Sequence, residues 1–343
     1  MARLLASAQD KLIPAWLQPV VALDLLHARG VDLSTVLQGT ALFVQDLPFA
    51  EHRLTAKHFD RLLANGDKLW PGKDYCFQLG HQLAEEGAGP LRTLMSEEPR
   101  LKEWVALVDR FNSLLTPSLT TRVHAVNEQD YFLLLNHVSQ FNVPEATLRT
   151  SVSLLTHALK RSALKPTVQV FLQAPTPPDI ELFHAHVPAQ CHFNSPFNGL
   201  RIQVEPSTAD DFQPSLRYQV ALRQCNELNP PKHYLMAAMT AMLWQFNAEP
   251  VSLQFAAEQL QVSSATLKRR LKEAGCSFQQ LSDSIRSERA VIELLLSGAS
   301  VEQVGARLHF QDTSNFRRAL KRWTGMTPSH LKAAYQELFG LVS

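Results

Sequence analysis

Two short basic segments near the C-terminal end of the chain carry the side chains best suited to binding an anionic polymer. They are Leu-Lys-Arg-Arg-Leu-Lys at 267–272 and Phe-Arg-Arg-Ala-Leu-Lys-Arg at 316–322. Guanidinium groups can make paired hydrogen bonds to guanine, and arginine and lysine both contact phosphate oxygens. In each segment the apolar residues recur at helical spacing, which predicts a helix with one buried face and one charged face.

The residues that precede these helices repeat one pattern. In the first copy the small residue Ala257 is followed four residues later by Gln261 and then by the apolar Val262. The second copy has the same order from Gly305 to Phe310, and Phe310 is expected in the core. A small residue allows two helices to approach closely, and the second helix is then free to enter a DNA major groove. Two such helix-turn-helix units in register are a stronger signal than one.

The expected helix ends agree with this pattern. Ser263 and Asp312 stand where they can cap the two basic helices. Gly275 and Gly325 follow these helices, at the position where a left-handed residue often ends a helix. Capping boxes are expected at Ser277 with Gln280 and at Ser300 with Gln303.

The distribution of charge supports a nucleic-acid partner, although the net charge of the whole chain is only +1. Residues 250–343 contain twelve Lys/Arg and eight Asp/Glu, a net charge of +4, so the preceding residues carry −3. Eight of those twelve cations lie in the two basic helices. A basic face on a nearly neutral protein is typical of a DNA-binding surface.

The second copy and the turn after it contain a recognisable set of residues. The set comprises Phe310, Ser314, Phe316, Arg318, Lys321, Gly325, Thr327 and Pro328. With these residues, about the last hundred positions of the chain resemble AraC/XylS-type bacterial transcription regulators. The chain departs from that pattern at His309 for glycine, Gly305 for alanine, Leu320 for phenylalanine, and Leu331-Lys332 for tyrosine-arginine. A left-handed turn is open to histidine, though less easily than to glycine.

The resemblance implies a set of DNA-contacting positions on the two basic helices. Ala265, Lys268 and Arg269 match positions that contact bases in the family, and an alanine methyl group can touch a thymine methyl group. Arg318 is equally suited to an internal ion pair. Arg270, Lys272, Lys321 and Arg322 are assigned to phosphates. The full set is Ala265, Lys268, Arg269, Arg270, Lys272, Thr313, Ser314, Asn315, Arg317, Arg318, Lys321 and Arg322.

The N-terminal part of the chain has a different pattern. Residues up to about 115 have the apolar spacing of helices. Beyond them, a helix is expected at 145–161 and strands at 119–126, 130–137, 167–173, 182–187 and 199–204. This order resembles the arabinose-binding-type effector domain of some AraC-type regulators. The segment 226–232, which contains Asn-Pro-Pro, is the expected linker, and a helix at 233–246 follows it.

We therefore expect a multi-domain protein, since a single core rarely grows beyond about 250–300 residues. The first domain, 1–228, is expected to be a mixed α/β ligand-sensing and dimerisation domain. The second domain, 229–343, is expected to be an all-α DNA-binding domain. Its two helix-turn-helix units lie at about 250–274 and 300–324.

The sequence contains a partial set of metal ligands and no recognisable set of catalytic residues. His184, His186, Cys191 and His192 suggest a metal site, because two histidines on one strand share a face. The sequence offers no third and fourth ligand at standard spacing, so neither a metal nor another cofactor is expected. It also contains no G-x-S-x-G, phosphate-binding glycine loop or H-E-x-x-H motif, so an enzyme is not expected. Four scattered cysteines and the lack of a visible N-terminal signal or membrane-spanning segment indicate a cytoplasmic protein.

These patterns together predict a sequence-specific transcription regulator that binds double-stranded promoter or operator DNA. By resemblance it is an activator, controlled by an unknown small-molecule effector bound to the N-terminal domain. The resemblance adds a second copy of the chain and RNA polymerase as partners. Two alternatives stay open: a constitutive DNA-binding regulator whose N-terminal domain only dimerises, and an enzyme domain fused to a DNA anchor.

Overall fold

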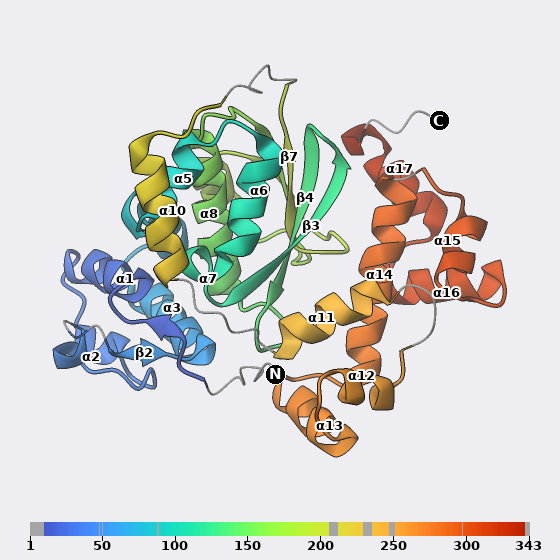
Figure 1. Ribbon diagram of the computed structural model, residues 1–343, viewed down its shortest axis with the longest axis horizontal. Helices are drawn as coiled ribbons and strands as arrows, with labels where there is room; N and C mark the ends of the chain where they lie inside the picture. The colour runs from blue at the N-terminus through green and yellow to red at the C-terminus, as the bar shows by residue number, and fades with distance from the viewer. Residues whose placement is uncertain are drawn as a thin grey trace. The chain divides into compact units, whose positions relative to one another are not determined.

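The computed structural model describes residues 10–47, 49, 51–87, 89–205, 212–228, 235–246, 251–296 and 298–339. These residues form two compact units, which divide between residues 234 and 235 (Figure 1). The first unit is a mixed α/β domain and the second is helical, which confirms the predicted fold class. Within the described ranges, every helix is too short or too polar to cross a bilayer.

The first unit contains most of the helices. They are α1 Gln18–His27, α2 Leu33–Val36, α3 Ala56–Leu69, α4 Tyr75–Gln82, α5 Leu91–Glu97, α6 Leu101–Arg110, α7 Asn112–Leu115, α8 Glu145–Arg161, α9 Ile180–His186 and α10 Leu216–Leu228. A short 3-10 helix, η1 Val44–Asp46, and a π-helical turn, η2 Leu83–Gly87, lie among them. Thr55 caps α3, as its sequence position suggests, by accepting a hydrogen bond from the His58 backbone N–H.

Five strands form the main sheet of this unit in the order β3-β4-β7-β5-β6. They are β3 Leu119–Asn127, β4 Asp130–His137, β5 Thr167–Phe171, β6 Gln190–His192 and β7 Gly199–Gln203. All neighbours are antiparallel except β5 and β6, and the strands expected at 119–126 and 130–137 pair with each other as β3 and β4. A separate two-residue ladder joins β1 Ile13–Pro14 to β2 Arg53–Leu54.

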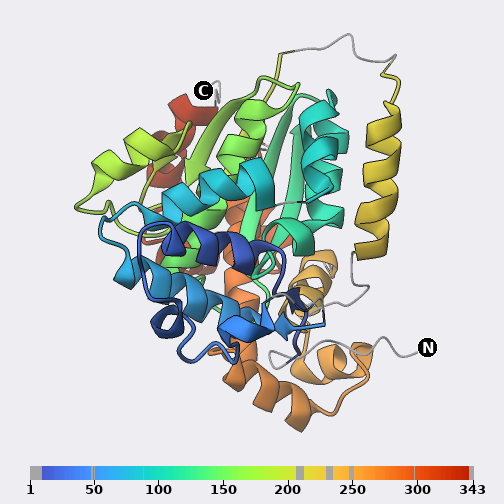
Figure 2. The same cartoon turned by 90° about the vertical axis from the view of Figure 1, so that its left-hand side faces the viewer.

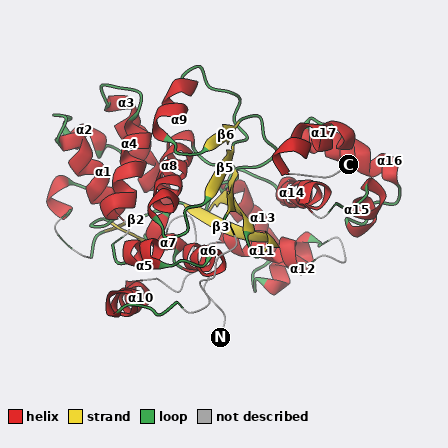
Figure 3. Ribbon diagram, turned by 90° about the horizontal axis from the view of Figure 1, so that it is seen from above, coloured by secondary structure: helices red, strands yellow, loops and turns green. Residues whose placement is uncertain are grey.

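Helix α8 is the central helix of the first unit and lies beside the sheet (Figure 3). It runs from Glu145 to Arg161, the range expected from the sequence, and packs closely against α4. At Gly80 a Cβ atom would lie only 2.5 Å from the Thr150 carbonyl oxygen and from the Ser153 Cβ. Glycine at this position therefore sets how closely the two helices approach.

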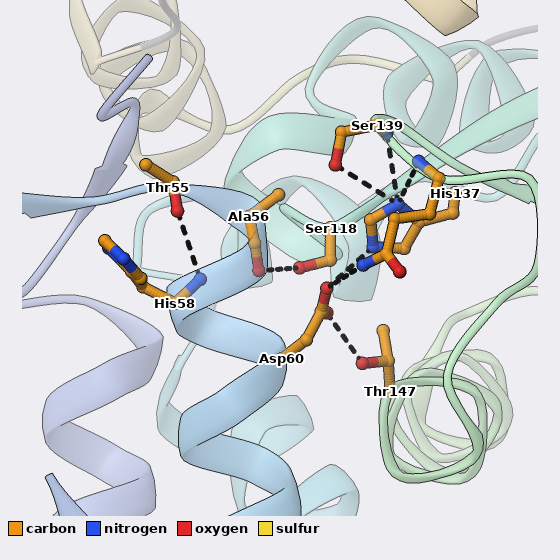
Figure 4. Close-up of polar contacts among 9 residues, drawn as sticks. Thr55, Ala56, His58, Asp60, Ser118, His137, Ser139 and Thr147 are labelled. Carbon is orange, nitrogen blue, oxygen red and sulfur yellow. Dashed lines mark hydrogen bonds and ion pairs between the residues drawn. The ribbon is translucent and has the colours of Figure 1, made fainter. Parts of the chain in front are cut away.

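A buried polar cluster fixes the position of α8 against α3 and the end of β4 (Figure 4). The Asp60 carboxylate accepts hydrogen bonds from Thr147 Oγ1 at 2.8 Å and from Gln140 Nε2 at 3.1 Å, and lies 2.8 Å from His137 Nε2. His137 Nδ1 accepts from the backbone N–H groups of Ser139 and Gln140. Because a backbone N–H can only donate, Nδ1 carries no proton, and Nε2 donates to Asp60. Both nitrogens of the imidazole are therefore used in holding the fold.

One strand prediction is wrong. Residues 182–187 were expected to be a strand, but Ile180–His186 form helix α9. The segment has few residues, and its apolar positions fit either period. Phe183 and Val187 lie four residues apart and are both buried, as on one face of a helix. The short strand β6 follows it and pairs with β5 in parallel.

Helix α10 was not expected from the sequence, and it packs alongside α5 (Figure 2). Tyr218 on α10 donates from its hydroxyl group to Glu98 Oε2 at 2.8 Å, and Glu98 is fully buried. The same carboxylate accepts from Arg100 Nε at 2.7 Å, which balances its charge. The predicted linker therefore begins within a helix, while its residues 229–232 lie outside the described ranges.

The second unit consists of helices. They are α11 Leu235–Gln245, α12 Leu253–Gln259, α13 Ser264–Glu273, α14 Phe278–Leu296, α15 Val301–Arg307, α16 Thr313–Thr324 and α17 Pro328–Phe339. Figure 1 shows α14 as its longest helix, with α15, α16 and α17 beside it. The helix expected at 233–246 corresponds to α11, and residues 233–234 lie outside the described ranges.

The predicted caps of the second unit are present. Ser263 accepts from the Thr266 N–H at 3.1 Å, and Asp312 accepts from the Asn315 N–H at 2.6 Å. Gly325 ends α16 in the left-handed conformation. Both capping boxes also form, between Ser277 and Gln280 and between Ser300 and Gln303.

Candidate nucleic-acid interface

Helix α13 presents a continuous exposed face on the side opposite its core contacts. Its buried side is formed by Leu267 and Leu271. The exposed face follows the positions i, i+3, i+4 and i+7, and consists of Ala265, Lys268, Arg269 and Lys272. Two flexible lysines and one planar guanidinium thus lie on a surface that only solvent covers within the unit.

Helix α16 presents the same face, 49 positions later in the sequence. Its buried side contains Phe316, Ala319 and Leu320. The exposed positions are again i, i+3, i+4 and i+7, and consist of Ser314, Arg317, Arg318 and Lys321. The two helices therefore repeat both the spacing and the charge of their outer faces.

Three of the exposed arginines pair with carboxylates. Arg269 Nη1 lies 2.6 Å from Glu273 Oε1, Arg317 Nη2 lies 3.6 Å from Glu302 Oε1, and Arg322 Nη2 lies 3.4 Å from Asp283 Oδ2. Exposed pairs of this kind contribute only about 0–1 kcal/mol, so a phosphate or a base edge can replace the carboxylate at little cost. Arg318 instead donates to Asn315 Oδ1 at 2.6 Å.

The remaining predicted residues are less accessible. Arg270 and Thr313 are half-buried. Asn315 is also half-buried, and its side-chain nitrogen donates to Asp312 Oδ2 at 2.5 Å. The structure therefore brings the exposed residues of the predicted set onto two matching faces, and leaves Asn315 occupied in local hydrogen bonds at the start of α16.

The turns that orient both helices have the same backbone conformation. Gln261 and His309 both adopt left-handed φ values, of 55° and 58°. In the second helix-turn-helix unit, a Cβ atom on Gly305 would lie 3.3 Å from the Phe316 Cβ, so glycine allows α15 and α16 to approach closely. In the first helix-turn-helix unit, the small residue Ala257 is fully buried at the same position.

Arg286 on α14 supports the second turn, and sequence reasoning missed it. Its Nη2 donates to the Leu308 carbonyl oxygen at 2.6 Å, and its guanidinium lies 4.6 Å from the centre of the Phe310 ring and 5.7 Å from that of Trp323. Burial lowers the pKa of Arg286, with Asp283 acting in the opposite direction. The sequence signal for this role was an arginine within the amphipathic helix that connects the two helix-turn-helix units. Phe310 itself is half-buried, so the expectation that it lies in the core is wrong.

His184, His186 and His192 do not form a metal site. On helix α9, His184 is exposed, while the His186 ring stacks on Phe77 with centroids 5.7 Å apart. Burial raises the pKa of the Cys191 thiol to about 12, which disfavours the thiolate that a metal needs. Among the described residues, no group of three or more His, Cys, Asp or Glu side chains could hold a metal ion.

The first unit contains a cavity of about 410 Å³ between α8, the segment 172–179 and α9. Ligand sites in proteins typically measure about 300–1,000 Å³ and are mostly apolar with a few polar groups. The lining includes Leu148 and Phe183, together with the charged residues Arg149 and Asp179. This is a second candidate site, in the unit that does not carry the basic helices.

Comparison with known proteins gives matches for both units. A family model described as a helix-turn-helix domain matches residues 256–334. A model described as the N-terminal arabinose-binding domain of AraC transcription regulators matches residues 30–205. The chain is 34% identical over 84 residues to the HTH-type transcriptional regulator VqsM of Pseudomonas aeruginosa, which is 24% of this chain and 26% of that protein. It is 37% identical over 82 residues to the ornithine utilization regulator of the same organism, 24% of each chain.

The matched segments span about a quarter of the length of these two relatives. Among solved structures, the transcriptional regulator CdpR of Pseudomonas aeruginosa aligns with 91% of this chain and 96% of its own, with 16% identity and a TM-score of 0.35. The family is therefore established by the models rather than by this structural alignment. Since the arabinose-binding model alone covers more than half of the 343 residues, the chain belongs to the AraC transcription regulators that have an arabinose-binding N-terminal domain.

Proposed function

We propose that the chain is a sequence-specific transcription activator that binds promoter DNA through α13 and α16. In this proposal residues 229–343 form the DNA-binding domain. Residues 1–228 form a domain that binds a small-molecule effector and a second copy of the chain. RNA polymerase is the partner through which activation occurs. No enzymatic activity is assigned to either domain.

The observation that carries the proposal is the duplicated exposed face on α13 and α16. On each face the side chains at positions i, i+3, i+4 and i+7 are exposed, and three of the four are cationic, which makes six cations among eight side chains. A recognition helix in a major groove needs such a narrow polar face, because its opposite side packs against the supporting helix. Two units on one chain can contact two major-groove segments about one turn, ~34 Å, apart.

The roles of the side chains follow from their chemistry. Arg269, Arg317 and Arg318 can make bidentate hydrogen bonds to guanine, and the Ala265 methyl group can contact a thymine methyl group. Lysines are suited to phosphates as point charges. The residues assigned to phosphates are Arg270, Lys272, Lys321 and Arg322, and the others assigned to DNA are Lys268, Thr313, Ser314 and Asn315.

The first test is binding to promoter DNA by variants of the full chain. Arg269→Ala and Arg317→Ala should each weaken specific binding by about 1–3 kcal/mol, without a change in the melting temperature. Arg307→Ala is the matched control, because Arg307 also forms an ion pair, with Glu293, but belongs to α15 and to neither exposed face. Affinity equal to that of the parent at matched salt would contradict the assignment of the face concerned.

The salt dependence tests the phosphate contacts separately. If about four of the eight clustered cations contact phosphates, the logarithm of the affinity should fall linearly with the logarithm of the salt concentration, with a slope of about −4. A slope close to zero on promoter DNA would contradict an electrostatic interface.

A constitutive regulator is the second candidate, and the cavity in the first unit favours effector control over it. A ligand can change DNA binding only if it binds one arrangement of the protein better than another. Transcription from the target promoter in a reporter strain should therefore rise when the effector is supplied. Equal transcription with and without every tested metabolite would support the constitutive alternative.

A further inference from the structure

The cavity in the first unit has an apolar floor that is built into the core. Leu148 and Val152 on α8, Leu172 after β5 and Phe183 on α9 line it, and all four side chains are buried. The segment 174–179, which contains three prolines, forms part of its rim. An apolar cavity gains little from enclosed water, and an apolar molecule that fits it is bound favourably.

One cation at the cavity is held in a fixed position. The Arg149 guanidinium lies 5.3 Å from the centre of the Phe183 ring and 5.7 Å from that of Phe77. Its Nη1 donates to Asp179 Oδ2 at 3.2 Å and its Nη2 donates to Asp179 Oδ1 at 3.4 Å, so Asp179 holds one edge of the guanidinium. Because the aromatic contacts and this ion pair determine its orientation before any ligand enters, Arg149 is pre-organised to accept a planar anion.

A second carboxylate occupies Arg149 in a way that a ligand can reverse. Glu145 Oε1 lies 2.6 Å from Arg149 Nη2, but the Glu145 side chain is 73% exposed, whereas that of Asp179 is 20% exposed. An exposed glutamate returns to water at little cost, since such pairs contribute only about 0–1 kcal/mol. When Glu145 leaves, Lys73 and Arg149 face the single remaining carboxylate of Asp179, and the lining has a net charge of +1.

We propose that this cavity binds an amphipathic monocarboxylate, whose carboxylate replaces Glu145 on Arg149 and whose apolar body lies over Leu148, Val152 and Phe183. The proposal rests on the effector control proposed above and names the chemical class of the effector. A cationic ligand is disfavoured by the same geometry. It would have to take Asp179 or Glu145 from Arg149, which would leave Arg149 with one carboxylate and place a second positive charge beside its guanidinium.

The test uses the full chain, a set of carboxylates that differ in the apolar part, and two probes that differ from octanoate only in the polar end. Hexanoate, octanoate, decanoate and 3-phenylpropanoate are titrated by calorimetry and followed by thermal melting, with octan-1-ol and octylamine as matched neutral and cationic probes. At least one carboxylate should bind and raise the melting temperature, and the alcohol and the amine should bind at least about tenfold more weakly, because they lack the charge-assisted hydrogen bonds to Arg149.

Four variants locate the binding. Arg149→Gln should weaken carboxylate binding by about tenfold to a hundredfold. Val152→Trp should abolish it by filling the cavity while the charges stay in place. Glu145→Gln should strengthen it by up to about fivefold, because the competing carboxylate is lost. Arg161→Gln, on the same helix but paired with Glu85 outside the cavity, is the control and should bind like the parent.

The outcomes separate this inference from the proposed function. Failure of all four carboxylates to bind, tighter binding of octylamine, or weaker carboxylate binding by Glu145→Gln would each overturn the ligand class. Promoter binding without any probe is measured on the same preparations. If it is intact while the carboxylates fail, only the assignment of the cavity is lost, whereas loss of promoter binding in the parent chain contradicts the proposed function itself. Glu145→Gln keeps the test decisive if Arg149→Gln does not fold, since its position is exposed.

Discussion

The two helix-turn-helix units present the same outer face but are supported differently. In the first, the basic helix α13 is self-contained at its surface, where Arg269 pairs with Glu273 one turn further along the same helix. In the second, α16 is tied to other elements, because Arg317 pairs with Glu302 on α15 and Arg322 pairs with Asp283 on α14. The same sequence pattern is thus compatible with a local and with a distributed network of charges.

The inner sides differ as well. In the second helix-turn-helix unit, the rings of Phe310, Phe316 and Trp323 pack around the turn, and the Arg286 guanidinium lies against Phe310 and Trp323. The buried side of α13 is aliphatic, with Leu267 and Leu271. The exposed face of each basic helix is set by four positions at helical spacing, whereas the contacts that hold the helix differ between the two helix-turn-helix units.

The largest expected effect is on stability and concerns the rings of Phe310 and Phe316 in the second helix-turn-helix unit. Phe316→Ala removes a fully buried ring and should lower the free energy of unfolding by about 3–5 kcal/mol. Phe310→Ala should cost clearly less, about 1–3 kcal/mol, because the ring is half-buried. Chemical denaturation of the full chain, followed by tryptophan fluorescence, measures both. Equal losses would mean that the two rings contribute equally to the free energy of unfolding, and that Phe310 is a core residue.

The next largest effect tests whether Arg286 supports only the second of the two helix-turn-helix units. Arg286→Met leaves the Leu308 carbonyl oxygen without its donor, and should weaken the α16 half of DNA binding by about 1.5–3 kcal/mol. A footprint should then show protection of one major-groove segment instead of two. Arg289→Met is the matched control on the same helix, since Arg289 contacts Glu293 and the Trp244 carbonyl oxygen. If both variants leave the two protected segments equal, Arg286 does not position the second unit.

The smallest effect compares the competing carboxylates. Glu273→Gln should strengthen DNA binding by up to about 1 kcal/mol, because Arg269 no longer pairs with a carboxylate 2.6 Å away. Glu302→Gln should have a weaker effect, since its distance to Arg317 is 3.6 Å. Affinities measured for both variants at one salt concentration give the order. The reverse order would show that the tighter ion pair helps to orient Arg269 rather than to occupy it.

The helical unit that begins at residue 235 could be predicted from the sequence because its signals are local. Caps such as Ser263 and Asp312, the glycine after α16, and the apolar positions of the basic helices each act within a few residues. Local hydrogen bonding and helical spacing are the features that a sequence pattern records directly. The exposed faces of α13 and α16 followed from the same spacing.

The first unit was less predictable, for two physical reasons. Helix α9 was assigned to a strand because its few apolar residues fit both periods. Helix α10 was missed because Leu216 and Val220 point outward and are 80% and 56% exposed, which blurs its amphipathic pattern. The cavity could not be predicted at all, because its lining comes from segments that are far apart along the chain, and only the tertiary fold brings Lys73, Leu148 and Phe193 together.

The left-handed residues at the two turns have a consequence for how these units tolerate change. Gln261 and His309 occupy a conformation that costs a residue with a side chain about 1–2 kcal/mol relative to the right-handed region. Such strain persists only where the surrounding packing determines the backbone more strongly than the residue itself does. The helices that meet at each turn therefore fix its backbone conformation, and the turn can hold a residue other than glycine, as Gln261 and His309 show, without loss of the bend.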